Sequence, residues 1–370
     1  MKSFLKMIFQ ILRRFDLILY YRYYRRTHAV VENQVLFYSE SREDLSGNFY
    51  YIYEAIKNDY LVKTVLKGST LTKKQRAYLM ATSHYILVDD FAPAIYPIPL
   101  RKQTRLIQVW HALGAFKTVG FARRNNKDRF SMTHRNYTDA IVSSPSIIND
   151  YAKAYRMDPK KIQALGIPRT DVFFDEAYKE KTRDELYERY PMLKEKKVIL
   201  FAPTFRGGNI HNAYYDYDQI NFEGLKEELG DDYFCIIKMH PFIKQNVPCS
   251  LDPSFYLDLS KEREINDLLF ITDILITDYS SVIFEASLLK IPTLFFAYDL
   301  EEYITQRDFF YSYDHYTYGP VVKNQEELIQ AIQNCTIDEK KLNDFIKTFT
   351  ISCDGHSTQR FIETLLRRKL

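Results

Sequence analysis

Short apolar runs, each about the length of a β-strand, alternate with longer amphipathic stretches along most of the chain. In the first half the runs occupy residues 35–38, 85–88, 106–110 and 140–142, and helical patterns occupy residues 47–58 and 70–82. In the second half the runs occupy residues 198–201, 234–237, 274–276 and 293–296, and helical patterns occupy residues 222–229 and 282–290. Near-continuous apolar runs are typical of strands buried on both faces of a parallel sheet. The pattern therefore predicts an α/β protein made of two facing Rossmann-like domains.

A charged stretch separates the two repeats of this pattern. Residues 175–197 are dense in Lys, Glu and Arg and include Pro191, which is typical of a domain junction. We therefore expect a first domain over residues 27–190 and a second over residues 191–350. Residues 351–370 are expected to form a terminal helix that packs back on the first domain.

The amino-terminal residues 1–26 combine apolar positions at helical spacing with many basic residues. Such a helix suits the surface of an anionic membrane, where its basic side chains face lipid head groups. A span would need about 20 consecutive apolar residues, and Asp16 and two arginines interrupt this stretch. The alternative is a helix packed on its own domain with solvated charges. The arginines expected at the membrane are Arg13, Arg14, Arg22 and Arg25.

Charge and cysteine content exclude several functions. The chain has 370 residues and a formal net charge of +3, which gives no global field for binding nucleic acid. Its four cysteines form no CxxC pair, so neither a disulfide nor a zinc site is expected. The paired carboxylates at residues 89–90 and 231–232 lack the spacing of a metal cage. No bound metal is predicted.

Polar loops follow four of the expected strands, where such folds bind ligands. The first loop begins with His111, and a neutral imidazole at that place can accept a hydroxyl proton. Lys117 and Arg123 follow and can attract phosphate. The alternatives are a structural histidine and solvated basic residues.

The second and third loops carry further candidates for binding phosphate. Thr204 and Arg206 stand in the second loop, before Gly207 and Gly208, although a simple turn explains the glycines equally well. In the third loop Lys238 can neutralise phosphate, and His240 can donate to a diphosphate oxygen.

The fourth loop runs from a buried strand through a polar corner directly into a helix. Asp278, Ser280 and Ser281 form the corner, and the first backbone amides of the following helix favour phosphate. Glu285 lies early in that helix, within reach of a ribose hydroxyl. Ordinary capping, and a favourable place for an acid near the helix start, explain these residues as well.

Together these loops resemble the CDP-glycerol glycerophosphotransferase family, enzymes that prime and extend teichoic acid chains in Gram-positive bacteria. The resemblance spans about residues 34–360. It rests on Gln108-Val109-Trp110-His111-Ala112, Gly114-Ala115 and Lys117, on Phe201-Ala202-Pro203-Thr204-Phe205-Arg206, on Lys238-Met239-His240-Pro241, on Thr277-Asp278-Tyr279-Ser280-Ser281, and on Asp354-Gly355 with Arg360.

The resemblance implies a fold of the glycosyltransferase B type and transfer of glycerol phosphate from CDP-glycerol, with release of CMP. It implies that His111 lies near the reacting hydroxyl and His240 at the donor diphosphate, while the serine corner and Glu285 bind diphosphate and ribose. The implied acceptor is an undecaprenyl-diphosphate-linked glycan, and the implied location is peripheral, on the cytoplasmic face of the membrane.

Several alternatives stay open from the sequence. CDP-ribitol is an alternative donor, and a nucleotide-sugar glycosyltransferase is an alternative enzyme of the same fold. The chain lacks the large extra amino-terminal domain of the long polymerases, so that a primase or a short polymerase is expected. No cofactor is obligatory, although Mg²⁺ can accompany the donor.

Overall fold

The computed structural model describes residues 2–124, 130–207, 211–248, 251–262 and 265–367. The chain folds into two compact units: unit 1 comprises Met1–Asp171 with Ile351–Leu370, and unit 2 comprises Val172–Thr350. Each unit contains a six-stranded sheet whose paired strands all run parallel. The prediction of an α/β fold with two Rossmann-like domains is confirmed at this level.

The sheet of unit 1 has the strand order β2-β1-β3-β4-β5-β6. Its central strand β3 is buried along its whole length, as expected for a strand with both faces covered. The strand order reverses between β1 and β3, and such a switch point is where open α/β sheets bind ligands. The strands are β1 Val31–Tyr38, β2 Leu61–Val65, β3 Ser83–Val88, β4 Arg105–Gln108, β5 Asp139–Ile141 and β6 Ile162–Gln163.

The sheet of unit 2 has the order β12-β11-β10-β7-β8-β9, the strand order of a Rossmann fold. The chain runs outward from β7 to β9 and then returns to the other side of β7, so that β7 and β10 flank the switch point. The strands are β7 Lys197–Phe201, β8 Tyr233–Ile237, β9 Tyr256–Asp258, β10 Ile274–Thr277, β11 Thr293–Phe296 and β12 Val321–Val322.

Helices connect the strands in both units. Those of unit 1 are α1 Lys2–Arg13, α2 Phe15–Thr27, α3 Asn48–Ile56, α4 Lys73–Thr82, α5 Ile148–Tyr155 and α13 Ser357–Phe361, the last followed by a π turn at Ile362–Leu366. Those of unit 2 are α6 Glu176–Arg189, α7 Phe222–Leu229, α8 Asn266–Leu269, α9 Val282–Leu288, α10 Leu300–Gln306, α11 Gln325–Gln333 and α12 Glu339–Phe349.

The two units meet in the sequence between Asp171 and Val172, earlier than the expected junction at residues 190–191. Helix α6 belongs to unit 2, because the Tyr178 hydroxyl donates to Asp267 at 3.1 Å. A second contact joins Nε of Arg183 to the carbonyl of Phe270 at 2.9 Å. Because α6 is polar on nearly every face, its composition resembles that of a linker.

The carboxy-terminal segment packs on unit 1. The hydroxyl of Tyr85, on the central strand β3, donates to the carbonyl of Leu366 at 2.5 Å. Nε of Arg360 donates to the carbonyl of Leu165 at 3.0 Å and its Nη1 donates to Asp354 at 2.9 Å. The late motif of Asp354 and Arg360 therefore fastens the end of the chain to unit 1.

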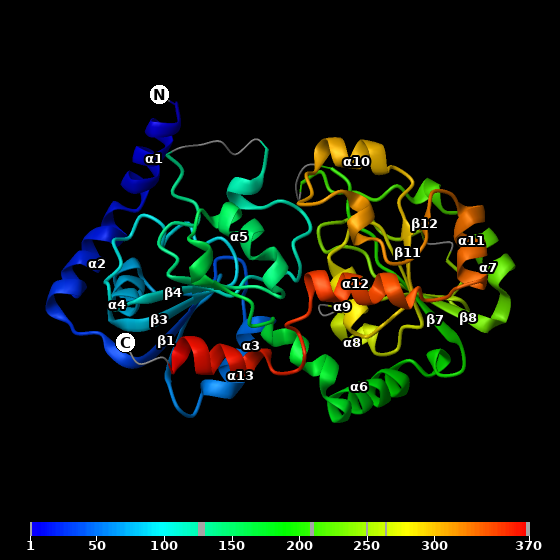
Figure 1. Ribbon diagram of the computed structural model, residues 1–370, viewed down its shortest axis with the longest axis horizontal. Helices are drawn as coiled ribbons and strands as arrows, with labels where there is room; N and C mark the ends of the chain where they lie inside the picture. Colours follow the sequence, from blue (N-terminus) through cyan, green and yellow to red (C-terminus); the bar gives the residue numbers. More distant parts are fainter. Residues whose placement is uncertain (1, 125–129, 208–210, 249–250, 263–264, 368–370) are drawn as a thin grey trace. The chain divides into compact units, whose positions relative to one another are not determined.

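The amino-terminal residues form two helices where the sequence suggested one. The break lies at Arg14, whose backbone leaves the helical region. Helix α2 buries Leu17, Ile18 and Tyr21 and packs against α4 (Figure 1). Among the described residues, no helix is long and apolar enough to cross a membrane.

Helix α1 leaves large apolar side chains exposed. Phe9 is 64% exposed and Leu12 is 62% exposed. Arg13 and Arg22 are exposed as well, and Arg14 is half-buried. The exposed Arg25 donates from Nη1 to the carbonyl of Pro99 at 2.9 Å, so that this arginine is tied to its own unit. The exposed apolar side chains of α1 agree with a helix on a membrane surface, and the packing of α2 agrees with a helix packed on its own domain.

Candidate functional site

The loops after β7 and β10 start from adjacent strand ends at the switch point of unit 2. Phe201 on β7 pairs with Ile276 on β10. Residues 202–207 and 278–281 follow directly. Chain segments far apart in the sequence are thus brought together at the place where this fold binds ligands. The predicted residues on these two loops are Thr204, Arg206, Asp278, Ser280 and Ser281.

A buried ion-pair network holds the two loops together. Arg206 donates from Nη1 to Asp278 at 2.8 Å, and from Nε and Nη2 to the two oxygens of Asp299 at 2.5 and 2.8 Å. The other oxygen of Asp278 accepts the backbone N–H groups of Thr204 and Tyr279 at 2.7 and 2.5 Å. Arg206 is 7% exposed and Asp278 is 1% exposed, so the carboxylate and guanidinium compensate each other away from water.

Four tyrosine rings surround the guanidinium of Arg206. Their centroids lie 5.1–5.7 Å from its central carbon, within the range of cation–π attraction. Burial alone would lower the pKa of Arg206, but the charge of Asp278 and the bonds to Asp299 outweigh it and raise that pKa. The rings belong to Tyr215, Tyr279, Tyr298 and Tyr303.

Arg206 was predicted to bind the phosphates of a donor. In the structure its guanidinium instead pairs with the carboxylates of Asp278 and Asp299. All three guanidinium nitrogens donate to protein oxygens, one of them also to the carbonyl of Thr204 at 2.7 Å. The side chain therefore fixes the positions of the two loops. A role for Asp278 and Thr204 in direct donor contact remains a prediction, since their described bonds also serve this network.

A polar cavity of about 240 Å³ lies beside this network in unit 2. Asp216, Asp299 and Glu302 line it together with Arg206. Three carboxylates repel a diphosphate, so this cavity does not suit the anionic part of a nucleotide. The remaining lining residues are Tyr214, Gln219, Tyr298, Tyr303 and Gln306.

The serine corner leads into α9 as predicted from the sequence. Ser280 and Ser281 are both half-buried, and Oγ of Ser280 accepts the backbone N–H of Val282 at 3.4 Å. Glu285 stands in the first turn of α9 and is buried. Burial, with a smaller contribution from Glu285, raises the pKa of Tyr318. Contact of Glu285 with a ribose stays a prediction.

The third loop places Lys238 and His240 after β8. Lys238 is buried, and its ammonium donates to the carbonyls of Ser260 and Glu262. His240 is partly exposed, and its Nδ1 accepts the backbone N–H of Phe242 at 3.1 Å. In a neutral ring the proton is then on Nε2, which makes this atom a hydrogen-bond donor.

His111 of unit 1 has the opposite tautomer. It follows β4, its side chain is exposed, and Nδ1 lies 3.1 Å from the carbonyl oxygen of Asp89. A carbonyl can only accept, so Nδ1 carries the proton and Nε2 of the neutral ring holds a lone pair. An exposed imidazole nitrogen with a lone pair can take a proton from a hydroxyl.

A strained turn positions His111. The preceding Trp110 has φ of +47°, a backbone conformation that costs about 1–3 kcal/mol in a side chain of this size. Asn48 compensates by donating from Nδ2 to the carbonyls of Val109 and Trp110 at 3.0 and 2.8 Å. The rings of Trp110 and His111 stack at 4.4 Å. Asn48 was not predicted, because an Asn within a helical pattern carries no sequence signal of its own.

An ion pair connects the two loops at the switch point of unit 1, and one of these loops bonds His111. Arg42, in the loop after β1, pairs through Nε with the buried Asp89, in the loop after β3. Nη1 of Arg42 donates to Ser46 at 2.8 Å. The carbonyl of Asp89 thus belongs to a fixed loop when it bonds His111. From the sequence, Asp89 was considered only as one of two paired carboxylates without metal spacing, and Arg42 was not considered.

The loop that carries Lys117 and Arg123 continues from His111. Arg123 is exposed and donates to the carbonyl of Thr118 at 3.2 Å, and Lys117 is half-buried. Gly114 is held from both sides, by Ser143, which accepts its N–H, and by Tyr151, which donates to its carbonyl, each at 2.9 Å. Binding of an acceptor or phosphate by the two cations stays a prediction.

No cluster of three or more His, Cys, Asp or Glu side chains in the described part of the chain is arranged to hold a metal ion. Cys235, Cys335 and Cys353 are free thiols, while Cys249 and Gly208 lie outside the described residues.

Residues 19–367 match the family described as CDP-Glycerol:Poly(glycerophosphate) glycerophosphotransferase. The teichoic acid poly(ribitol-phosphate) polymerase of Bacillus spizizenii is 42% identical in an alignment of 355 residues that covers 92% of this chain and 57% of that protein. The chain therefore spans little more than half of that relative. The teichoic acid ribitol-phosphate primase of the same organism is 37% identical in an alignment of 361 residues that covers 91% of this chain and 92% of the primase.

The fold has a counterpart among solved structures. The wall teichoic acid polymerase TagF matches with a TM-score of 0.77 at 24% identity, over 98% of this chain and 97% of that one. At this identity the similarity concerns the fold alone. It agrees with the glycosyltransferase B type of fold expected from the sequence.

Proposed function

Because the chain belongs to the CDP-glycerol:poly(glycerophosphate) glycerophosphotransferase family, we propose that it transfers an alditol phosphate from a CDP-alditol to a hydroxyl of a lipid-linked acceptor and releases CMP. The observation that carries the proposal is the exposed side chain of His111, whose Nε2 has its lone pair because Nδ1 bonds the carbonyl of Asp89. Unit 1 supplies the base for the acceptor, and unit 2 holds the donor.

In the proposed reaction the acceptor oxygen attacks the phosphorus atom that carries the alditol. Nε2 of His111 takes the hydroxyl proton as the new P–O bond forms. The bond between this phosphorus and the bridging oxygen breaks, and the electron pair leaves with CMP. The protein's main task is then to orient the two groups and to stabilise charge on the phosphates.

The donor half of the proposal rests on unit 2. His240 offers a donor N–H at Nε2, suited to an oxygen of the diphosphate. Ser280 and Ser281 stand at the neighbouring strand end, at the switch point. Arg206 is a positioning residue in this scheme, because its bonds to Asp278 and Asp299 tie the two loops. Mg²⁺ on the donor would offset further charge.

CDP-ribitol and CDP-glycerol are both compatible with this site, since the two donors differ only in the length of the alditol. The relatives at 42% and 37% identity are named as ribitol-phosphate enzymes, and they support CDP-ribitol. The family description and the motifs support CDP-glycerol, the donor expected from the sequence. We propose that the chain uses one of the two and rank CDP-ribitol first.

The acceptor is proposed to be an undecaprenyl-diphosphate-linked glycan, reached from the cytoplasmic face of the membrane. The exposed Phe9 and Leu12 on α1 can enter the lipid interface, and the exposed Arg13 and Arg22 can pair with anionic head groups. The partner on this side of the protein would therefore be a membrane surface.

Donor specificity tests the proposal. Purified full-length protein with a lipid-linked acceptor is given CDP-ribitol, CDP-glycerol or a UDP-sugar, and the released nucleotide is measured. CMP release with CDP-ribitol above that with CDP-glycerol supports the ranking, and the reverse result assigns glycerol. Turnover with the UDP-sugar alone would replace the proposal with a nucleotide-sugar glycosyltransferase.

A further inference from the structure

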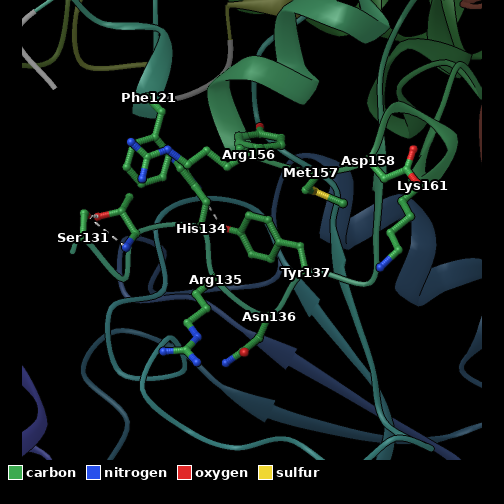
Figure 2. A pocket seen from close by; sticks show the side chains of 12 residues that line it. Phe121, Ser131, His134, Arg135, Asn136, Tyr137, Arg156, Met157, Asp158 and Lys161 are labelled. Carbon is green, nitrogen blue, oxygen red and sulfur yellow. Dashed lines mark hydrogen bonds between the residues drawn. The ribbon is translucent and has the colours of Figure 1, made fainter. Parts of the chain in front are cut away.

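A cavity of about 270 Å³ lies in unit 1, apart from the residues that the proposed reaction uses (Figure 2). It is lined by Phe121, by the loop that precedes β5, and by the end of α5 with the segment that follows it. Buried rings of His134, Tyr137 and Tyr155 contribute to its wall. Polar side chains of Ser131, Thr133 and Asn136 line it as well.

The charge of this cavity is predominantly positive. Arg135, Arg156 and Lys161 line it and are exposed, and Asp158 is its one acidic lining residue. Arg135 and Lys161 form no ion pair with any residue that the structure describes. Three cations beside hydroxyl and amide groups are the chemistry that recognises a phosphate oxygen.

The cations are held on a prepared backbone. The guanidinium of Arg156 lies over the ring of Phe121 (Figure 2), 3.5 Å from its centroid. His134, Asn136 and Arg156 all have positive φ, of +61°, +78° and +52°. Such conformations are costly and often occur where a ligand is bound. Asn136 is fixed by donating to the carbonyls of residues 96 and 98 at 3.0 and 2.9 Å.

Aromatic contacts connect the cavity to His111. The ring of Tyr155 in the cavity wall lies 5.9 Å from that of Trp110, and Trp110 stacks on His111 at 4.4 Å. The wall of the cavity is thus two ring contacts away from the proposed base. On another side, Phe130 precedes the cavity loop and packs against Phe4 of α1 at 5.6 Å.

We infer that this cavity is an acceptor subsite that binds a phosphodiester group of the acceptor, behind the terminal hydroxyl that His111 activates. The inference rests on the proposed function and adds the chemical class recognised in the acceptor. A phosphodiester with a single negative charge matches a lining that includes Arg135 and Lys161, whereas an uncharged glycan would leave these two cations without an anionic partner among the described residues. The site would favour acceptors that already carry an alditol phosphate.

The test uses the double variant Arg135→Gln with Lys161→Gln in the full-length protein. Two acceptors are compared, one lipid-linked glycan with a phosphodiester-linked alditol and the same glycan without it. Loss of two charged contacts is expected to raise the KM for the phosphodiester acceptor about tenfold. The donor KM and the rate with the plain glycan should change little. Lys160→Gln is the matched control, since Lys160 is exposed beside Lys161 and does not line the cavity.

Each outcome has a separate meaning. A wild-type protein that releases no CMP with either acceptor contradicts the proposed function itself. An active wild type whose KM for the phosphodiester acceptor is unchanged by the double variant contradicts only the subsite. Sedimentation with vesicles of phosphatidylglycerol tests the other source of phosphodiesters, and weaker binding by the double variant would assign the cavity to lipid head groups and overturn the inference.

Discussion

Replacing Arg206 with Met tests the central structural claim about unit 2. The substitution keeps most of the side-chain volume and removes the positive charge that compensates Asp278 and Asp299. Asp278 is 1% exposed and cannot be solvated where it stands, while the Asp299 side chain is 17% exposed and can be reached by water in part. The larger share of the loss therefore comes from Asp278.

The magnitude follows from the cost of leaving a buried charge without its partner, typically about 3–5 kcal/mol. Because Asp278 also accepts two backbone N–H groups, part of its charge stays stabilised. We therefore expect Arg206→Met to lower the free energy of unfolding by about 3 kcal/mol. Asp278→Asn should also lower the free energy of unfolding. The loss in the double variant should be smaller than the sum of the two single losses, and the difference should be about 1–3 kcal/mol.

Urea unfolding followed by far-UV circular dichroism measures this loss. The one tryptophan, Trp110, is in unit 1, so its fluorescence reports the unfolding of unit 1 separately from that of unit 2, which contains Arg206. Lys181→Met is the control, since its pair with Glu185 is exposed and at 3.7 Å, and should change stability by no more than about 0.5 kcal/mol. A loss below about 1 kcal/mol in Arg206→Met, or strict additivity with Asp278→Asn, would refute the reasoning.

Three further predictions concern unit 1. Burial, with a smaller effect of a nearby arginine, lowers the pKa of His134 to about 3, so between about pH 6.5 and pH 3 the unfolded chain binds a proton that the folded chain does not bind. As the pH is lowered through this range, the free energy of unfolding should decrease by up to about 1.4 kcal/mol per pH unit. His134→Gln should flatten this slope in acid denaturation. Gly120→Ala places a methyl group 2.3 Å from the carbonyl of Ala154 at φ of +52°, and a thermal melt should show a loss of about 2 kcal/mol or more; an unchanged melting temperature would contradict this close approach of loop and helix. Phe9→Asp with Leu12→Asp should weaken sedimentation with anionic vesicles at least about tenfold, whereas equal sedimentation would leave α1 without a membrane role.

The sequence predicted the interior of both sheets and missed their edges. All eight strands expected from apolar runs are present, with boundaries shifted by a few residues. The four strands that were missed are β2, β6, β9 and β12, and each is the outermost strand of its sheet. An edge strand is covered on fewer sides and carries fewer apolar residues, as the partly exposed pattern of β2 shows. Periodicity therefore finds buried strands more readily than edges.

The residues of the candidate site that come directly after a strand could be predicted from the sequence. The residues that pair with them could not. His111, His240 and the residues at the ends of β7 and β10 could be named from their position in the chain. Asp299 and Arg42 lie far along the sequence from the residues that they bind, and only the fold brings them together. The sequence also could not indicate that Arg206 would pair with two carboxylates of the protein, because an arginine in a polar loop is equally typical of an internal ion pair and of a ligand contact.

Acceptor-dependent CMP release by the wild type and by His111→Gln tests the central claim most directly. Gln keeps the ability to form hydrogen bonds but cannot take a proton at neutral pH. We expect CMP release from a CDP-alditol only when a lipid-linked acceptor is present, and in the variant a loss of about 10²–10⁴-fold in kcat with little change in the KM of the donor. Equal turnover by His111→Gln and the wild type would contradict the assignment of His111 as the base.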